Sequence, residues 1–293
     1  MGARRFIKSP LRFPAGKSRA VEQILSLIPP FTEYREPMVG GGSVFFRGKQ
    51  LHPDRHYWIN DINAELYCFR KSLQSAPELL VQAVRKIREG TTDGRNLFYN
   101  LLKQYGTGTE LERAIRFLVL NRITFSGTVD SGGYSEQAFH ARFTHSSIRA
   151  LEMAHHVLRD TTITNMDYAE VVNAPAEDVF LFLDPPYYSA ADSRLYGKRG
   201  HLHTEFAHQR FAQIIQECPH HWLITYDECA EVRRLFCDAC IVEWQLQYGM
   251  NNYKQPTARP GRKLFIANYD IRSRYAKQLA LVMEWRAHYS EAD

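Results

Sequence analysis

The stretch VFLFLDPPY at 179–187 decides the fold class. Its first five residues are all apolar, as in a strand that is buried on both faces of a parallel sheet. An acid and two prolines follow at once, and proline can neither continue a strand nor donate a ladder hydrogen bond. The strand must therefore end in a rigid turn at its carboxyl end, where open α/β sheets form their sites.

Other strands alternate with helical stretches on both sides of this run. The expected strands lie at 33–39, 56–59, 161–165, 222–226, 241–248 and 263–269. Amphipathic periodicity predicts helices at 18–28 and 206–217. This alternation predicts a doubly wound, Rossmann-like α/β sheet that is largely parallel, and the final pair of strands predicts an antiparallel edge strand.

A long helical region separates the second strand from the third. Helices are expected at 63–73, 77–89, 94–105, 110–122 and 146–158. The segment 124–144 contains three glycines and no helical stripe, which predicts a long loop or hairpin. Because the whole region is far longer than a normal crossover, we predict that residues 69–150 form an inserted, mainly helical domain. Residues 1–68 and 151–293 would then form the other domain.

Composition excludes several classes of protein. The chain has 293 residues of which 44% are hydrophobic, as in a globular protein. No apolar run approaches the ~18 residues of a membrane span, and the first residues lack the apolar region of a signal peptide. Five cysteines, an odd number, fit thiols kept reduced in a cytosol. We therefore expect a cytoplasmic protein without a membrane partner. Cys237 and Cys240 have metal-knuckle spacing, but a lone pair favours buried thiols, so no metal is expected.

Positive charge is segregated along the chain. Residues 1–19 hold six Lys and Arg and no acid, and residues 69–150 hold twelve against seven acids. The remainder of the chain is net negative. Such segregation favours a polyanionic partner such as nucleic acid, with a solvated surface as the alternative.

A glycine run and an acid mark the ends of the first two strands. Gly40, Gly41 and Gly42 follow the first strand, where backbone could approach a nucleotide-like ligand, although a structural turn would use the same residues. Asp61 ends the second strand, nineteen residues after Gly42. This is close to the ~20-residue spacing at which an acid binds a ribose diol. Capping of the following helix is the alternative for Asp61.

The acid after the buried strand has its own chemistry. Asp184 can accept a hydrogen bond from an amine, and a carbonyl freed by the proline turn can accept a second. Tyr187 offers a ring face to a planar base. These groups suit a reaction at the amine of a nucleobase.

Four motifs together resemble the Dam-like DNA adenine methyltransferases. They are RFPAGK at 12–17, EPMVGGGSV at 36–44, DIN at 61–63 and DPPY at 184–187. Their order along the chain also matches that family, and the resemblance spans nearly the whole chain. Met38 departs from the family pattern, which usually has Phe there.

The resemblance implies an enzyme that uses S-adenosylmethionine to methylate the exocyclic amine of an adenine flipped out of a specific sequence in double-stranded DNA. No obligate protein partner is implied, and the family occurs in bacteria, archaea and phages, often in restriction-modification. The catalytic residues would be Asp184, Pro185, Pro186 and Tyr187. The cofactor would contact Phe13, Ala15, Gly16, Lys17, Gly40, Gly42, Asp61, Asp167 and Tyr168. DNA would contact Asn121, Arg122, Thr124 and Ser126 in the inserted target-recognition domain.

Several alternatives stay open. A methyltransferase of this kind could act on an RNA base or a protein amide, but such sites commonly carry Asn in place of Asp184. The chain could also be an inactive DNA-binding relative, although its motifs are intact. Locally, Asp167 could cap a helix. Arg122 could hold the end of its own helix instead of reading a guanine edge.

Overall fold

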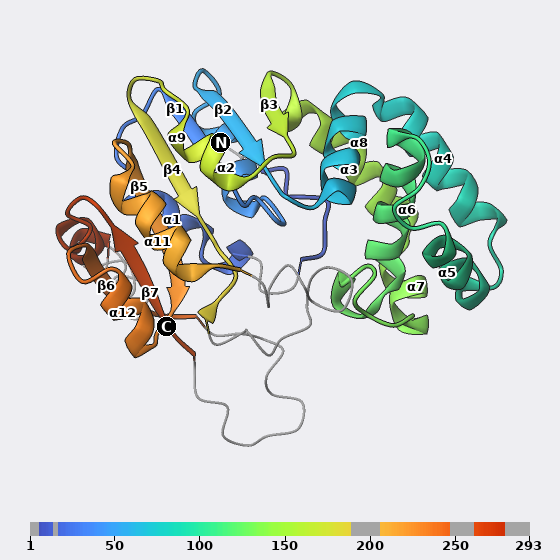
Figure 1. The fold of residues 1–293 in the computed structure, drawn as a ribbon. Coiled ribbons are helices and arrows are strands. Elements are labelled where there is room, and N and C mark those ends of the chain that lie inside the picture. The colour runs from blue at the N-terminus through green and yellow to red at the C-terminus, as the bar shows by residue number, and fades with distance from the viewer. Residues whose placement is uncertain (1–5, 14–16, 189–205, 247–260, 279–293) are drawn as a thin grey trace, which may run out of the picture.

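A seven-stranded sheet lies at the centre of the computed structural model, which describes residues 6–13, 17–188, 206–246 and 261–278 (Figure 1). The order of the strands is β3-β2-β1-β4-β5-β7-β6. Their bounds are β1 Glu33–Glu36, β2 His56–Asn60, β3 Thr161–Thr164, β4 Val179–Leu183, β5 His221–Asp227, β6 Cys240–Leu246 and β7 Gly261–Ala267. The first five strands run parallel, and β7 runs antiparallel between β5 and the edge strand β6. The predicted fold class is confirmed.

Helices cover both faces of the sheet. The helices of the described residues include η1 Lys17–Arg19, α1 Val21–Leu27, α2 Ser43–Leu51, α3 Ala64–Ser75, α4 Pro77–Gly90, α5 Gly94–Lys103, α6 Glu110–Ile123, η2 Phe125–Gly127, α7 Glu136–Arg142, α8 His145–Leu158, α9 Tyr168–Asn173, α11 His208–Glu217 and α12 Ala230–Leu235. Residues 272–278 are helical as well. The helices α1, α2 and α3 share a core with one face of the sheet, and α9, α11 and α12 pack on the other.

Strand β4 explains why both faces must be covered. All five of its side chains are buried. Phe180 and Phe182 join the core under α1 and α2, whereas Leu181 and Leu183 join the core under α9 and α11. Alternate side chains of a strand point to opposite faces, so an all-apolar strand is stable only between two layers of helices.

The helices α3 to α8 form the long region between β2 and β3, beyond the β3 edge of the sheet (Figure 1). Their buried side chains belong to the same hydrophobic cluster as one face of the sheet. The boundaries at 69 and 150 therefore stay predictions, since the core is continuous across them. The segment 124–144 contains helix α7 after a loop that is closed by a bridge between Thr124 and Tyr134.

The order of the strands reverses between β1 and β4. The chain runs outward from β1 through β2 to β3, and returns to β4 on the other side of β1. In open α/β sheets a crevice forms outside the carboxyl ends of the strands at such a switch point. Here the glycine run leaves β1 and Asp184 leaves β4 at this place.

Candidate active site

The glycine turn after β1 is covered by an aromatic ring. Gly40 and Gly42 both have positive φ, at 43° and 69°, which glycine adopts without strain. A Cβ on Gly40 would lie 2.8 Å from the ring of Phe13, and one on Gly41 would lie equally close to Phe13 Cβ. The guanidinium of Arg70, from α3, donates to the carbonyl of Gly40. The turn is thus shaped by segments that are distant in sequence.

Asp61 joins the end of β2 to this turn. Its Oδ2 accepts from Gly40 N at 2.9 Å, and its Oδ1 accepts from Asn63 N at 3.0 Å. Burial raises the pKa of Asp61, although these two bonds and the nearby Arg70 oppose the shift. The helix cap that was the alternative for Asp61 is supplied by Asn63, whose side chain accepts from the first turn of α3.

Asp184 is held by two donors at the carboxyl end of β4. Nζ of Lys17 lies 2.6 Å from Oδ1 and 2.5 Å from Oδ2, and Oγ1 of Thr225 donates to Oδ1 at 2.7 Å. The side chains of Lys17 and Asp184 are 4% and 25% exposed, so their ion pair is largely shielded from water. The structure thus brings together Lys17, which was expected to contact the cofactor, and Asp184, which was expected to be catalytic.

Tyr187 lies beside two ammonium groups. Nζ of Lys263 is 4.0 Å from the ring centroid, and Nζ of Lys17 is 5.0 Å from it. Lys263 lies in β7 opposite Asp227 of β5, and Asp227 accepts from the backbone N of Tyr188 at 3.0 Å. Burial lowers the pKa of Lys263 to about 8. The tetrapeptide is therefore bordered by residues of β5 and β7.

A buried carboxyl group lies at the end of β1. Glu36 at the end of β1 accepts from Tyr34 Oη at 2.7 Å and from Phe45 N, in the first turn of α2, at 3.1 Å. Burial and, to a lesser extent, the charge of Asp184 raise the pKa of Glu36 to about 8, whereas the bond from Tyr34 and the charge of Arg70 oppose the shift. The carboxyl group therefore keeps its proton more readily than an exposed glutamate.

Asp167 and Tyr168 begin α9, which follows β3. The Asp167 side chain caps this helix through Ala169 N at 2.8 Å and forms an ion pair with Arg210 at 3.1 Å. Burial raises the pKa of Asp167, but Arg210 and the Ala169 bond outweigh it and leave the pKa below its usual value. The guanidinium of Arg210 also lies 5.2 Å from the ring of Tyr168. The capping alternative is thus observed, and a cofactor role for the pair stays a prediction.

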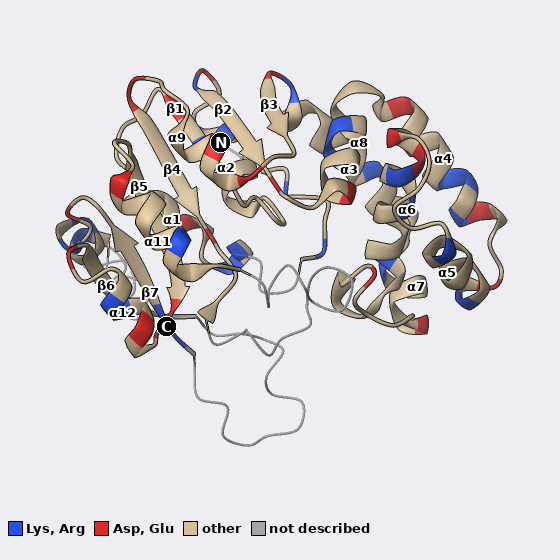
Figure 2. Ribbon diagram, in the orientation of Figure 1, with Lys and Arg blue, Asp and Glu red and all other residues tan. Residues whose placement is uncertain are grey.

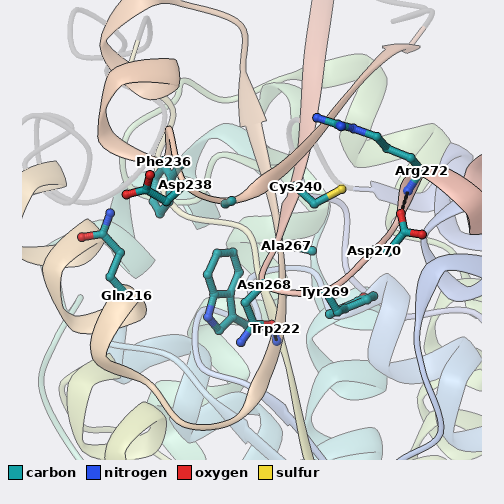
Figure 3. A pocket seen from close by; sticks show the side chains of 11 residues that line it. Gln216, Trp222, Phe236, Asp238, Cys240, Ala267, Asn268, Tyr269, Asp270 and Arg272 are labelled. Carbon is teal, nitrogen blue, oxygen red and sulfur yellow. Dashed lines mark hydrogen bonds between the residues drawn. The ribbon is translucent and has the colours of Figure 1, made fainter.

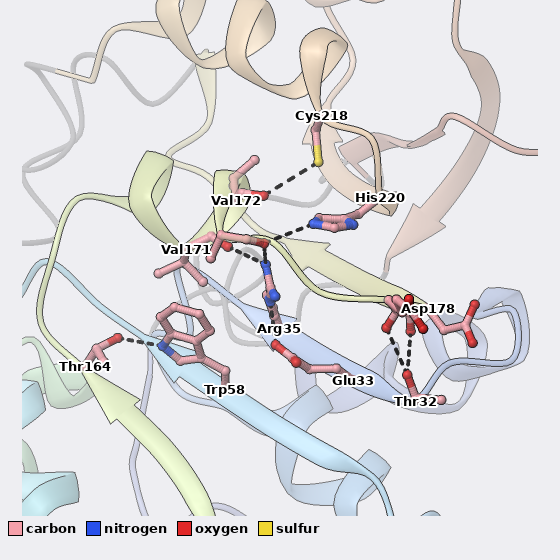
Figure 4. Close-up of polar contacts among 12 residues, drawn as sticks. Thr32, Glu33, Arg35, Trp58, Thr164, Val171, Val172, Asp178, Cys218 and His220 are labelled. Atoms are coloured by element: carbon pink, nitrogen blue, oxygen red, sulfur yellow. Dashed lines mark hydrogen bonds and ion pairs between the residues drawn. The ribbon is translucent and has the colours of Figure 1, made fainter.

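The other end of α9 is fixed from β1. The residue Arg35 is 1% exposed. Its Nη1 donates to the carbonyls of Val171 and Ala174 (Figure 4). The guanidinium also lies 5.2 Å from the ring of Trp58. These bonds satisfy carbonyls at the end of the helix, which has no further turn to do so. Arg35 thereby sets where α9 lies against the sheet.

Asn121 and Arg122 do not face the surface. Asn121 is fully buried and bonds the backbone N and O of Arg12 at 3.0 and 2.7 Å. Arg122 is 9% exposed and donates to the carbonyl of Pro10. Both side chains thus hold the N-terminal segment against α6, and a direct DNA contact from either would require that segment to move. The DNA contact expected of Asn121 and Arg122 stays a prediction.

The loop after α6 does present an exposed side chain. Thr124 is buried and bonds the carbonyl of Leu120 at 2.7 Å, whereas Ser126 has φ of 55° at the turn. Phe125 between them is 68% exposed, more than any other large apolar side chain of the described residues. The glycines in the sequence indicated this loop, but only the exposure of Phe125 in the structure makes it a candidate for contact with a ligand.

Arginines gather where the N-terminal segment meets this helical region. Burial, together with the charges of Arg12 and Arg142, lowers the pKa of Arg122 to about 10. Burial also lowers the pKa of Arg12, with Arg142 contributing again. Three like charges therefore repel one another here, next to the loop of Phe125. Figure 2 shows that basic residues also recur along α4, α5 and α6.

Sequence reasoning missed the partners that later strands supply. Thr225, Asp227 and Lys263 all contact the tetrapeptide or the residue that follows it, yet they lie about 40 to 80 residues further along the chain. Their only signal in the sequence is that each is a polar residue within or at the end of a predicted strand. Two of the expected cofactor residues, Ala15 and Gly16, lie outside the described residues.

A separate cavity of about 720 Å³ opens at the opposite end of β5 (Figure 3). Trp222 and Tyr269 line it, but its polar groups bond within the chain. Asn268 bonds Trp222 N and His220 O, and Asp270 bonds Arg272 N. It is therefore a weaker candidate site than the crevice. Within the described ranges, no three His, Cys, Asp or Glu side chains gather as metal ligands, and no helix is long and apolar enough to span a membrane.

Comparison with known proteins gives a family and several relatives. Residues 13–250 match the family described as D12 class N6 adenine-specific DNA methyltransferase. A DNA N-6-adenine-methyltransferase of Escherichia phage P1 is 27% identical over 81% of this chain and 32% of its own length. A DNA adenine methylase of Vibrio cholerae is 26% identical over 60% of this chain and 64% of its own length. The type II methyltransferase M.MjaIII of Methanocaldococcus jannaschii is 24% identical over 62% of this chain and 69% of its own length. The chain thus spans less than two thirds of the first two relatives.

Proposed function

This chain belongs to the family of D12 class N6 adenine-specific DNA methyltransferases, and we propose that it methylates the exocyclic amine of an adenine within a specific sequence of double-stranded DNA. The methyl donor would be S-adenosylmethionine, and the adenine would be flipped out of the duplex. We further propose that the protein acts in the cytoplasm of a bacterium or archaeon, or during phage infection.

One observation carries the proposal. The carboxylate of Asp184 and the ring of Tyr187 stand at the end of β4, beside the glycine turn that ends β1. This is the switch point of the sheet, where a ligand bound by the turn and a base on Tyr187 would meet. The arrangement supports transfer between two bound molecules, with the cofactor on the β1 side.

The residues present fit the proposed cofactor. Asp61 can accept from ribose hydroxyls, and the positive end of the α2 helix favours a carboxylate. The glycine turn packs its backbone against the ring of Phe13, since a side chain at Gly40 would collide with that ring. S-adenosylmethionine would supply a methyl group on a sulfonium that is already a good leaving group. Phe13, Gly40, Gly42 and Asp61 would hold it, with Lys17 beside the reacting amine.

Asp184 would assist the reaction through its acceptor oxygens. The lone pair of an adenine amine is conjugated into its ring, so the amine is a poor nucleophile. By accepting an N–H bond, Asp184 would favour a tetrahedral, developing-cationic nitrogen over the planar ground state. Tyr187 would offset the unstacking of the base, which costs a few kcal/mol, by providing a ring on which it stacks. No covalent intermediate with the protein is needed.

DNA would lie across the loop of Phe125 and the arginines near it. An exposed aromatic side chain can stack on a base, and clustered arginines are stabilised by phosphates. The net positive charge of residues 1–19 and 69–150 favours a polyanionic partner such as DNA. Sequence reading is assigned to the segment around Ser126, because Asn121 and Arg122 are buried.

The decisive experiment supplies tritiated S-adenosylmethionine and unmodified genomic DNA, followed by mapping of modified adenines by long-read sequencing. We expect label in DNA and N6-methyladenine in one short sequence. Transfer to RNA or protein instead would select those substrates. Binding of DNA without transfer by the wild-type protein would select an inactive DNA-binding relative.

A further inference from the structure

The tetrapeptide turn has few means of holding its own position. Pro185 and Pro186 have no N–H, so two of the donors that would normally tie a turn to its surroundings are missing. The catalytic acceptor of the proposed function comes directly before them, at Asp184. Its place must therefore depend on side chains that reach it from neighbouring elements.

Strand β5 supplies such side chains on both sides of the prolines. Thr225 Oγ1 donates to Asp184 Oδ1 at 2.7 Å, and Asp227 Oδ1 accepts from Tyr188 N at 3.0 Å. The two residues are two positions apart, so they lie on one face of the strand. Their strand is paired on both sides, to β4 through Ile224 and to β7 through Thr225 itself. Thr225 is fully buried. The sheet therefore holds the Thr225 side chain in place beside Asp184.

The two oxygens of Asp184 are consequently not equivalent. Oδ1 accepts from Thr225 as well as from Lys17, whereas Oδ2 accepts from Lys17 alone among the described residues. Lys17 reaches Asp184 from a short 3-10 helix by a long side chain with several rotatable bonds. Thr225 has a short side chain on a strand within the sheet.

We propose that Thr225 is a positioning residue for Asp184: its hydroxyl occupies Oδ1 and fixes the carboxylate so that Oδ2 is the oxygen that accepts the target amine. This inference rests on the proposed function. It predicts that the hydroxyl matters for the chemical step and not for binding of the cofactor.

The test compares Thr225→Val with Thr225→Ser. Valine keeps the shape and removes the hydroxyl, whereas serine keeps the hydroxyl. Thr161→Val is the matched control, because Thr161 is also a buried threonine whose hydroxyl is bonded, in the strand β3 of the same sheet. Single-turnover methylation at saturating DNA and S-adenosylmethionine is measured for all three and for the wild type. Calorimetry gives the affinity for S-adenosylmethionine, and crystal structures give the orientation of Asp184.

We expect Thr225→Val to slow the single turnover by ~10- to 100-fold, as for loss of a hydrogen bond to a charged group. Its affinity for the cofactor should stay within about threefold. Thr225→Ser should stay close to the wild type, and Asp184 should be rotated only in the valine variant. Equal losses in the valine and serine variants, or a loss no larger than that of Thr161→Val, would overturn the proposal. A wild-type protein that transfers no methyl group to any DNA would instead overturn the proposed function, and the inference with it.

Discussion

Asp184 forms an ion pair with Lys17, and the loss of this pair adds to the effect expected of replacing Asp184. Asp184→Ala would remove the proposed acceptor of the target amine and leave the buried Lys17 without its partner. We expect at least a ~10²-fold loss of turnover, with cofactor affinity within a few-fold. Asp184→Asn should be milder because the amide oxygen still accepts. Rate measurements and calorimetry on both variants check this, and a proportional loss of cofactor binding would move Asp184 into the cofactor site.

Asp61 has a proposed contact with the ribose of the cofactor and two observed hydrogen bonds, from Gly40 N and Asn63 N. Asp61→Ala should raise the KM for S-adenosylmethionine with little change in kcat, since a ribose contact made equally in ground and transition states affects binding alone. It should also lower the Tm, because Gly40 N and Asn63 N lose their acceptor. Kinetics and thermal unfolding separate the two effects. A lower Tm with an unchanged KM would show that Asp61 bonds Gly40 N and Asn63 N but does not contact the ribose.

Glu36 predicts a pH dependence of stability. Its pKa in the folded protein is about 8, above the usual value of 4.5. Between these values the folded state holds a proton that the unfolded state has lost, so stability falls as pH rises. Glu36→Gln has no such proton and keeps an oxygen for Tyr34. Its stability relative to the wild type should therefore rise from pH 5 to 8, by up to ~1.4 kcal/mol per pH unit. Urea unfolding at four pH values measures this, and parallel curves would contradict it.

Among the elements, strand β4 could be predicted to the residue and several short helices could not. An unbroken apolar run bounded by an acid and two prolines leaves one interpretation, and β4 spans Val179–Leu183. The first strand ends at Glu36 and not at 39, because the chain turns at Pro37 toward the glycine run. Helices α9 and α12 have six residues each, too short for a helical stripe, and only the capping alternative for Asp167 pointed to α9.

Helix α6 shows why side-chain roles are harder to predict than elements. Its range was close to the prediction, yet its last polar residues turn inward to the N-terminal segment, a contact across more than 100 positions. No local pattern encodes such a partner. The same holds for Thr225 and Lys263, which reach Asp184 and Tyr187 only because β5 and β7 pair beside β4.

Arg122 therefore carries a prediction about stability. Arg122→Ala should leave the carbonyl of Pro10 without its donor and lower the Tm by a few degrees, as for loss of one buried hydrogen bond. The set of methylated sequences should not change. Arg149→Ala, an exposed arginine of α8, is the control and should leave the Tm unchanged. A relaxed sequence set at an unchanged Tm would restore base reading to Arg122.

Across the whole molecule, the site collects segments that are far apart in sequence. The glycine turn, Asp61, the tetrapeptide and β5 could be placed at one edge from the sheet topology alone, because carboxyl ends of parallel strands meet there. The sequence could not reveal that Lys17 bridges the N-terminal segment to Asp184, since a long side chain can pair with any acid nearby. The predicted motifs thus meet at one edge of the sheet, and tertiary contacts supply their partners there.

The distribution of charge leads to the last prediction. Arg142 is exposed at the end of α7, and its charge reaches Arg12 and Arg122. If DNA phosphates neutralise this cluster, Arg142→Ala should weaken binding of all duplexes alike and reduce the salt slope of the affinity by about 1. Lys86→Ala, an exposed cation of α4 outside the cluster, is the control and should change the slope less. Titrations of labelled duplex at several salt concentrations measure both slopes. Equal slopes for the Arg142 variant and the wild type would place the DNA backbone elsewhere, because removing a cation that neutralises a phosphate must lower the number of counterions released.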